Sequence, residues 1–152
     1  MGEPSPFKHE RADDSAGFLL WKITTLWQQR LAGVLGEFGI TQTQYAILAS
    51  LCWFDEQRLA PTQADLVAHT KLDKMTLSKA GRRLEDDGLL RRTPSSVDAR
   101  SVNVALTPAG RKLAFRAIQG IEKADDVFFA SLSPQQLIDY KRLTLKLVAA
   151  NA

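Results

Sequence analysis

The chain has 152 residues and a net charge of +3 at neutral pH; 45% of the residues are hydrophobic and 24% are charged. These values are typical of one globular domain, so they argue against a disordered tail, a fibrous repeat and a supercharged chain. No stretch approaches the roughly 18 uninterrupted apolar residues of a membrane span, and residues 1–15 are too polar for a signal peptide. The single cysteine, Cys52, excludes an internal disulfide and a multi-cysteine zinc site. We therefore expect a soluble cytoplasmic domain without a metal or a cofactor.

The positive charge is concentrated in the middle third of the chain. Residues 61–112 contain ten Lys or Arg and six Asp or Glu, a net charge of +4, whereas the rest of the chain has a net charge of −1. A local excess of cations favours binding to nucleic-acid phosphates, because each neutralised phosphate releases counterions. The same excess also fits an ordinary solvated surface, so charge alone does not decide between the two.

The first part of the chain predicts an arm and two helices. Residues 1–14 contain two prolines and scattered charges without a period. Residues 15–38 carry apolar side chains at three- and four-residue steps, the pattern of a long helix. These side chains cover more than one stripe of that helix, so we expect it to need packing partners on several sides. Thr41 and Gln44 have the spacing of a capping box, which predicts that a second helix follows.

A pair of short helices comes next. Thr62 is followed three residues on by an acid, which predicts the start of a helix that ends near Thr70. A link of about three residues leads into a fourth helix, 73–87, which stops at Gly88. Two short helices joined by so tight a turn are typical of a helix-turn-helix unit.

The residues after Gly88 predict a two-stranded ribbon. Residues 89–92 and 101–106 read as strands, the second with alternating side chains, and the connection 93–100 is too long for a tight hairpin, so it should project. Arg100 lies in this loop, and arginine is suited to a narrow minor groove. Asp98 either orients the Arg100 guanidinium or braces the loop.

Two more helices complete the predicted fold. Thr107 and Pro108 form a cap followed by proline at the first helical position, and Ser133 and Gln136 form another capping box. The fold class is therefore mainly α with a small β-wing, with six helices and a two- to three-stranded antiparallel sheet. The predicted division is a flexible arm at 1–14, dimerisation helices at 15–40 and 108–150, and a winged helix-turn-helix lobe at 41–107.

The fourth helix carries side chains suited to the major groove, which an α-helix enters with a face of hydrogen-bonding and cationic groups. Its apolar residues include Met75, Leu77 and Leu84. The residues predicted to contact DNA are Thr76, Ser78 and Lys79 at base edges, Arg82 or Arg83 at a base or phosphate, Thr62 and Gln63 at a phosphate, and also Lys74, Asp98 and Arg100. An ordinary surface helix with mixed polar side chains is the alternative reading of this helix.

Over about residues 15–150 the chain resembles the MarR family of transcriptional regulators. The resemblance rests on Leu72-Asp73-Lys74-Met75-Thr76 with Leu77-Ser78-Lys79, on Arg83-Leu84-Glu85 followed by Asp87-Gly88-Leu89-Leu90-Arg91-Arg92, on Asp98-Ala99-Arg100 and on Leu106-Thr107-Pro108-Ala109-Gly110-Arg111. The order and spacing of these four stretches are specific, although each stretch by itself is common. The family pattern often has an arginine where this chain has Ala99.

The resemblance implies a homodimer in which the first, fifth and last helices intertwine and two lobes bind the half-sites of a pseudo-palindrome. It also implies a repressor that a small ligand, often aromatic or anionic, releases from DNA. Trp21, Lys22 and Trp53 are the candidate ligand contacts, although core or dimer packing is the favoured interpretation of the tryptophans and a solvated charge that of Lys22. The sequence has no phosphate loop, nucleophile elbow or metal motif, so we expect no catalytic residues and no metal ligands. The alternative function is a winged-helix module that binds another protein and has no operator.

Overall fold

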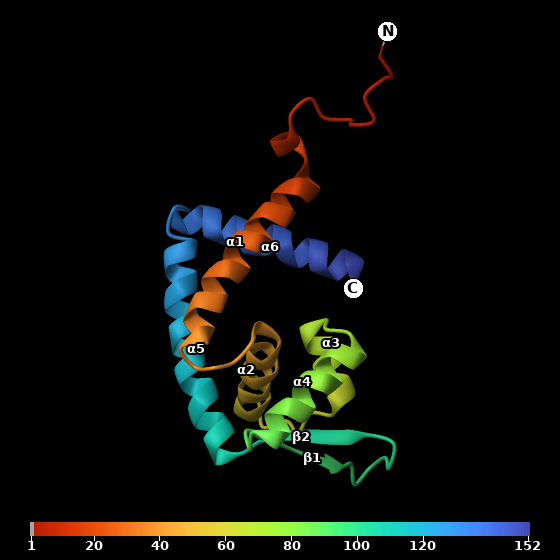
Figure 1. Cartoon of the computed structure of the whole chain (residues 1–152), viewed down its shortest axis with the longest axis vertical. Helices are drawn as coiled ribbons and strands as arrows, with labels where there is room; N and C mark the ends of the chain where they lie inside the picture. The colour runs from red at the N-terminus through yellow and green to blue at the C-terminus, as the bar shows by residue number, and fades with distance from the viewer. Residues whose placement is uncertain (1) are drawn as a thin grey trace.

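The computed structural model describes residues 2–152, which fold into six α-helices and one two-stranded antiparallel sheet (Figure 1). The elements are α1 (Ala16–Gly36), α2 (Gln42–Glu56), α3 (Gln63–Thr70), α4 (Lys74–Asp86), β1 (Leu90–Pro94), β2 (Val102–Leu106), α5 (Pro108–Phe128) and α6 (Pro134–Asn151). The predicted fold class is confirmed. The predicted arm, 1–14, ends in a single 3-10 turn at Ala12–Asp14, and Met1 lies outside the described residues.

Each helix begins where a short polar side chain accepts a hydrogen bond from a backbone N–H group three residues on. The capping residues are Ser15, Thr41, Thr62, Asp73, Thr107 and Ser133. Such a cap satisfies one of the N–H groups that the first helical turn leaves unpaired. Gly88 follows α4 with a φ of 74°, the left-handed conformation that glycine adopts without strain. This turn leads the chain from α4 into β1.

The larger hydrophobic core lies inside the lobe formed by α2, α3, α4, the sheet and the first turns of α5. Its buried side chains are Ile47, Leu48, Leu51, Leu66, Leu77, Leu84, Leu90, Val104 and Ala114. Every element of the lobe supplies at least one of them. The angle between α3 and α4 is therefore set by packing on this shared core.

The first strand extends two residues further toward the loop than the sequence predicted, and the second begins one residue later. β1 pairs antiparallel with β2 from Leu90 opposite Leu106 to Pro94 opposite Val102, so the connecting turn begins at Ser95. One isolated bridge outside these strands joins Thr62 to Asn103, and the sheet itself has two strands, the smaller of the two predicted numbers. The two strands and their turn form a wing at one end of the molecule (Figure 1).

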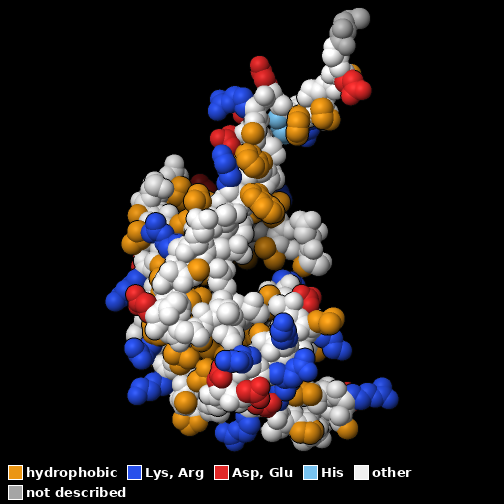
Figure 2. Space-filling view, viewed as in Figure 1, with side chains coloured by type: hydrophobic (Ala, Val, Ile, Leu, Met, Phe, Trp, Pro, Cys, Tyr) orange, Lys and Arg blue, Asp and Glu red, His pale blue; other side chains and the backbone are white. Residues whose placement is uncertain are grey.

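A second, smaller core joins α1 to α5, and it consists of Leu31, Leu35, Ala117 and Ile121. α6 follows the end of α5 that is farther from the wing and crosses α1 in the view of Figure 1, with the start of α1 and the arm extending beyond it. α6 has no buried residue. Hydrophobic side chains are visible on the surface along α1 in Figure 2. No helix within residues 2–152 is both long enough and apolar enough to cross a membrane.

Candidate nucleic-acid interface

The start of α3 is joined to the wing. The backbone N–H of Val104 in β2 donates to the carbonyl oxygen of Pro61 at 3.0 Å, and Thr62 pairs with Asn103. These contacts place the first turn of α3 beside the base of the wing, with α4 next to it. We call the surface formed by residues 62–64, the exposed side of α4 and the wing turn 95–101 the α3–α4–wing surface.

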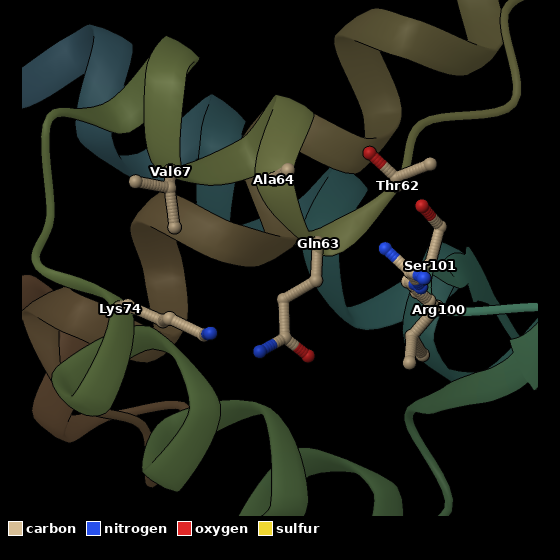
Figure 3. Close-up of a pocket in the computed structure, with 8 residues that line it drawn as sticks. Thr62, Gln63, Ala64, Val67, Lys74, Arg100 and Ser101 are labelled. Carbon is tan, nitrogen blue, oxygen red and sulfur yellow. The ribbon is translucent and has the colours of Figure 1, made fainter. Parts of the chain in front are cut away.

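An open hollow of about 320 Å³ lies in this surface (Figure 3). Gln63 and Lys74 point into the hollow from α3 and α4, and Arg100 and Ser101 lie on its wing side. Thr62 lines the same hollow. The fold therefore brings together four predicted contact residues that lie in three separate segments of the sequence.

The first turn of α3 leaves two backbone donors open toward this surface. Thr62 and Asp65 form a capping box, in which the Thr62 hydroxyl accepts from the Asp65 N–H at 3.1 Å and the Asp65 carboxylate accepts from the Thr62 N–H at 2.8 Å. The N–H groups of Gln63 and Ala64 have no partner within residues 2–152. Such groups at a helix start are suited to a phosphate oxygen.

The predicted base-contacting residues lie in the first two turns of α4. Thr76 and Lys79 are exposed, and Ser78 is half-buried. The Asp73 carboxylate accepts a hydrogen bond from the Thr76 hydroxyl and another from the Thr76 N–H at 2.8 Å. These two bonds hold the pKa of Asp73 below its usual value. The Thr76 hydroxyl donates within the chain, so its oxygen is left to accept hydrogen bonds from a base.

Met75 is a residue that the sequence reading grouped with the apolar side of α4. In the structure its side chain is 82% exposed, while Leu77 and Leu84 are buried. Methionine is an apolar residue type, which suggested that its side chain is buried. The helical spacing of Leu77 and Leu84 marks the buried side of α4, and Met75 does not share that spacing. Met75 therefore belongs to the outward side of α4.

The cations on the α3–α4–wing surface differ in their partners. Arg83 forms an ion pair with Asp87, with Nε and Oδ2 at 3.2 Å. Four cations among the predicted contact residues have no ion pair within residues 2–152: Lys74, Lys79, Arg82 and Arg100. Figure 2 shows Lys and Arg side chains around α4 and the tip of the wing, with acidic side chains among them. Four unneutralised cations give this surface a local positive potential.

The wing turn is held by hydrogen bonds within itself. Asp98 Oδ1 accepts from the Arg100 backbone N–H at 2.9 Å, and the Ser95 N–H donates to the Ser101 carbonyl oxygen at 2.9 Å. Of the two roles considered for Asp98, the structure shows the brace of the loop, since this bond engages the Arg100 backbone. The Arg100 guanidinium is left exposed beside the hollow.

A contact that the sequence did not reveal joins α4 to the wing. Glu85 accepts from Arg92 at three atoms, the backbone N–H at 2.9 Å, Nη2 at 3.0 Å and Nε at 3.3 Å. The side-chain and backbone hydrogen bonds from Arg92 lower the pKa of Glu85. Both guanidinium donors of Arg92 reach Oε1 and its backbone N–H reaches Oε2, so both carboxylate oxygens are engaged by one residue of β1. This contact therefore holds β1 at a defined angle to the helix beside it.

The three candidate ligand contacts lie on two helices, α1 and α2. Trp21 is 72% exposed on α1, and the neighbouring Lys22 pairs with Asp13 at 2.7 Å. Trp53 lies near the end of α2, with its ring stacked on His69 of α3 at a centroid distance of 5.2 Å. The structure does not unite them in one pocket, because the Trp53 ring packs against α3.

Trp27 lines a hollow of about 240 Å³ between α1, α5 and α6. Its Nε1–H donates to Asp125 Oδ1 at 2.9 Å. Phe128, Phe129 and Tyr140 line the same hollow. Within residues 2–152, no group of three or more His, Cys, Asp or Glu side chains is placed to hold a metal ion.

Comparison with known proteins gives consistent results. A family model described as "ArnR1-like, winged-helix domain" matches residues 36–127. The uncharacterized HTH-type transcriptional regulator YdcH of Bacillus subtilis is 32% identical over 124 residues, which cover 82% of this chain and 84% of that protein. The HTH-type transcriptional repressor Rv2887 of Mycobacterium tuberculosis is 30% identical over 137 residues, with coverage of 90% and 96%.

Solved structures share the same architecture. A MarR-family transcriptional regulator from Silicibacter pomeroyi is 25% identical, with a TM-score of 0.76 and 92% of each chain covered. CouR from Rhodococcus jostii, bound to p-coumaroyl-CoA, is 26% identical, with a TM-score of 0.78 over 93% of this chain and 96% of that one. The chain therefore belongs to the MarR family of winged helix-turn-helix proteins and is a DNA-binding transcriptional regulator.

Proposed function

We propose that the protein is a homodimeric repressor that binds a pseudo-palindromic operator and is released from it by a small ligand. In this proposal residues 41–107 form the DNA-binding lobe, residues 15–40 and 108–150 form the dimer, and 1–14 remain a flexible arm. The observation that carries the DNA-binding part is the set of unneutralised cations on the α3–α4–wing surface. Lys74, Lys79, Arg82 and Arg100 have no ion pair within residues 2–152, so their charges are available to phosphates and base edges.

Within the proposed complex, each predicted residue has a stated role. α4 lies in the major groove, where Thr76, Ser78 and Lys79 contact base edges and Arg82 or Arg83 contacts a base or a phosphate. Thr62 and Gln63 hold a phosphate at the start of α3, and Lys74 supplies a further cation. Arg100 enters the minor groove, and Asp98 holds the turn that presents it.

The test is equilibrium binding to a duplex selected from a random pool by the wild-type protein. Arg100→Ala should weaken binding by about 1–3 kcal/mol if the guanidinium is inserted in the groove. Lys123→Ala, at an exposed cation of α5 away from this surface, is the matched control and should leave affinity unchanged. Unchanged affinity of Arg100→Ala at physiological salt would remove the role assigned to Arg100.

A salt titration on random duplex DNA separates this function from a winged-helix module that binds only proteins. A DNA-binding protein loses affinity with a steep log–log dependence on salt concentration, because bound phosphates release counterions. A protein-binding module would show little affinity for DNA at any salt concentration.

Apolar side chains on the terminal helices support the homodimer. The exposed ones on α1 are Phe18, Leu19, Leu20, Trp21, Ile23 and Leu26, and those on α6 are Ile138, Tyr140, Leu143, Leu145, Leu147 and Val148. Exposed apolar patches of this kind mark surfaces for association. A two-fold dimer covers the same patch on both copies and also gives the pseudo-palindrome its symmetry.

Sedimentation equilibrium at micromolar concentration tests the dimer. The wild-type protein should have twice the mass of the chain, and Leu147→Glu, at a side chain that is 64% exposed on α6, should shift the mass toward the monomer. Leu59→Glu is the matched control, because Leu59 is 53% exposed and lies outside the terminal helices. A wild-type monomer at this concentration would contradict the proposed dimer.

The ligand part of the proposal is supported by CouR, which has been solved with p-coumaroyl-CoA bound. We propose a small aromatic or anionic effector, contacted either by Trp21 and Lys22 on α1 or by Trp53 on α2. Aromatic carboxylates added to the protein–DNA complex should lower the DNA anisotropy, and Lys22→Ala should raise the concentration required if the contacts lie on α1. A panel of such ligands that leaves the complex intact would count against this effector class.

A further inference from the structure

The outward side of α4 carries one large apolar side chain in line with two cations. Met75 and Arg82 each precede a buried leucine, Leu77 or Leu84, by two positions, which is about 200° around an α-helix. They therefore point away from the lobe. Lys79 lies four residues after Met75 and three before Arg82, the spacings that keep side chains on one face of a helix. Met75, Lys79 and Arg82 form the centre of the face that α4 turns toward solvent.

For DNA recognition, the position of Met75 on α4 is more informative than its exposure alone. Single apolar side chains are common on protein surfaces, and Met75 belongs to neither hydrophobic cluster of this chain. It is, however, the second residue of α4 and is 82% exposed at the helix end that meets base edges in the proposed complex. A side chain in this place becomes buried against a base pair when the helix enters the groove.

The chemistry of methionine determines which groups on the base edges of the major groove it can contact favourably. In the major groove, the C5-methyl of thymine is the apolar group on a base edge, and the other exposed groups donate or accept hydrogen bonds. A thioether is at most a weak acceptor, so it leaves such groups unpaired when it covers them. Contact with a methyl group has no such penalty, and the flexible Met side chain adapts to reach it.

We propose that Met75 is a specificity-determining residue that selects a thymine in each half-site through van der Waals contact with its C5-methyl group. This inference rests on the proposed operator binding by α4. Val97 is also strongly exposed, at 94%, but it lies at the tip of the wing. The minor groove that the wing enters presents no methyl group, so Val97 has no such role.

The test removes single methyl groups from the DNA. The probe is the duplex that the wild-type protein selects from a random pool, with each thymine replaced in turn by deoxyuridine, which lacks only the C5-methyl group. At one position per half-site the replacement should weaken wild-type binding about four-fold, and about sixteen-fold when both half-sites carry it, since burial of one methyl group is worth about four-fold in affinity.

Met75→Ala should bind the thymine and deoxyuridine duplexes with equal affinity and should select a more degenerate base at that position. Alanine is a strong helix former, so α4 is retained, which circular dichroism verifies. Val97→Ala, the matched control, should keep the full effect of deoxyuridine. The inference is overturned if no thymine replacement weakens wild-type binding, or if Met75→Ala responds to deoxyuridine as strongly as the wild type.

Failure of the inference is distinguishable from failure of the proposed function. A protein that selects a duplex and loses affinity on Arg100→Ala, but ignores the thymine methyl groups, binds an operator without the role assigned to Met75. A protein that selects no duplex from the pool refutes operator binding itself, and the inference with it.

Discussion

The start of α5 packs against the turn after α4 so closely that only glycine fits at position 110. A Cβ atom at Gly110 would lie 1.7 Å from the carbonyl oxygen of Leu89 and 2.7 Å from its carbonyl carbon. Both neighbours are backbone atoms, so no side-chain rotation relieves the overlap. Replacement of Gly110 by alanine must therefore push α5 away from the turn by more than 1 Å.

That movement breaks two hydrogen bonds, from the Thr107 N–H to the Leu89 oxygen at 3.2 Å and from the Thr107 hydroxyl to the Gly88 oxygen at 2.6 Å. Each is worth about 1 kcal/mol net, and overpacking adds about 1–3 kcal/mol. The higher helix propensity of alanine offsets about 1 kcal/mol. We expect Gly110→Ala to lower the free energy of unfolding by about 3 kcal/mol and Tm by roughly 6–12 °C.

The assay is urea denaturation followed by circular dichroism at a fixed protomer concentration, since the proposed dimer would make unfolding depend on concentration. Gly33→Ala is the control, because Gly33 lies inside α1 and its Cβ would meet no atom within 4 Å. This control should gain up to about 1 kcal/mol. If Gly110→Ala proves as stable as the wild type, the close approach of α5 to the turn is wrong.

Three further predictions concern polar side chains. Glu85→Gln should weaken operator binding without changing its salt dependence, because the substitution frees Arg92 from its place beside α4 and removes no phosphate contact. A reduced salt dependence would instead assign Arg92 to a phosphate. Burial, with the charges of nearby acids, raises the pKa of Tyr45 to about 12. The free energy of unfolding should therefore fall as the pH rises from 10 to about 12, and Tyr45→Phe should abolish that fall in urea titrations. Trp27→Phe removes the bond to Asp125 and should cost about 1–2 kcal/mol in the same assay, whereas an unchanged midpoint would show that this bond contributes nothing.

Local signals in the sequence were sufficient to predict the elements and the fold class. Capping residues such as Thr41 and Ser133 act on backbone groups only three residues away. Apolar periods and the change of period after Gly88 are likewise properties of short segments. The boundaries shifted by one or two residues, because helix ends and strand ends depend on the packing of neighbouring elements. β1 reaches Pro94, for example, because the turn closes through Ser95 and Ser101.

The residues that supply the charges, caps and apolar faces can be identified without coordinates, because those properties belong to single residues and their near neighbours. The tertiary structure decided which of these residues meet. It placed Gln63, Lys74 and Arg100 around one hollow, paired Glu85 with Arg92, and turned Met75 outward. These outcomes depend on how the helices and the wing pack on a shared core, and contacts between segments distant in sequence form only when that packing is complete.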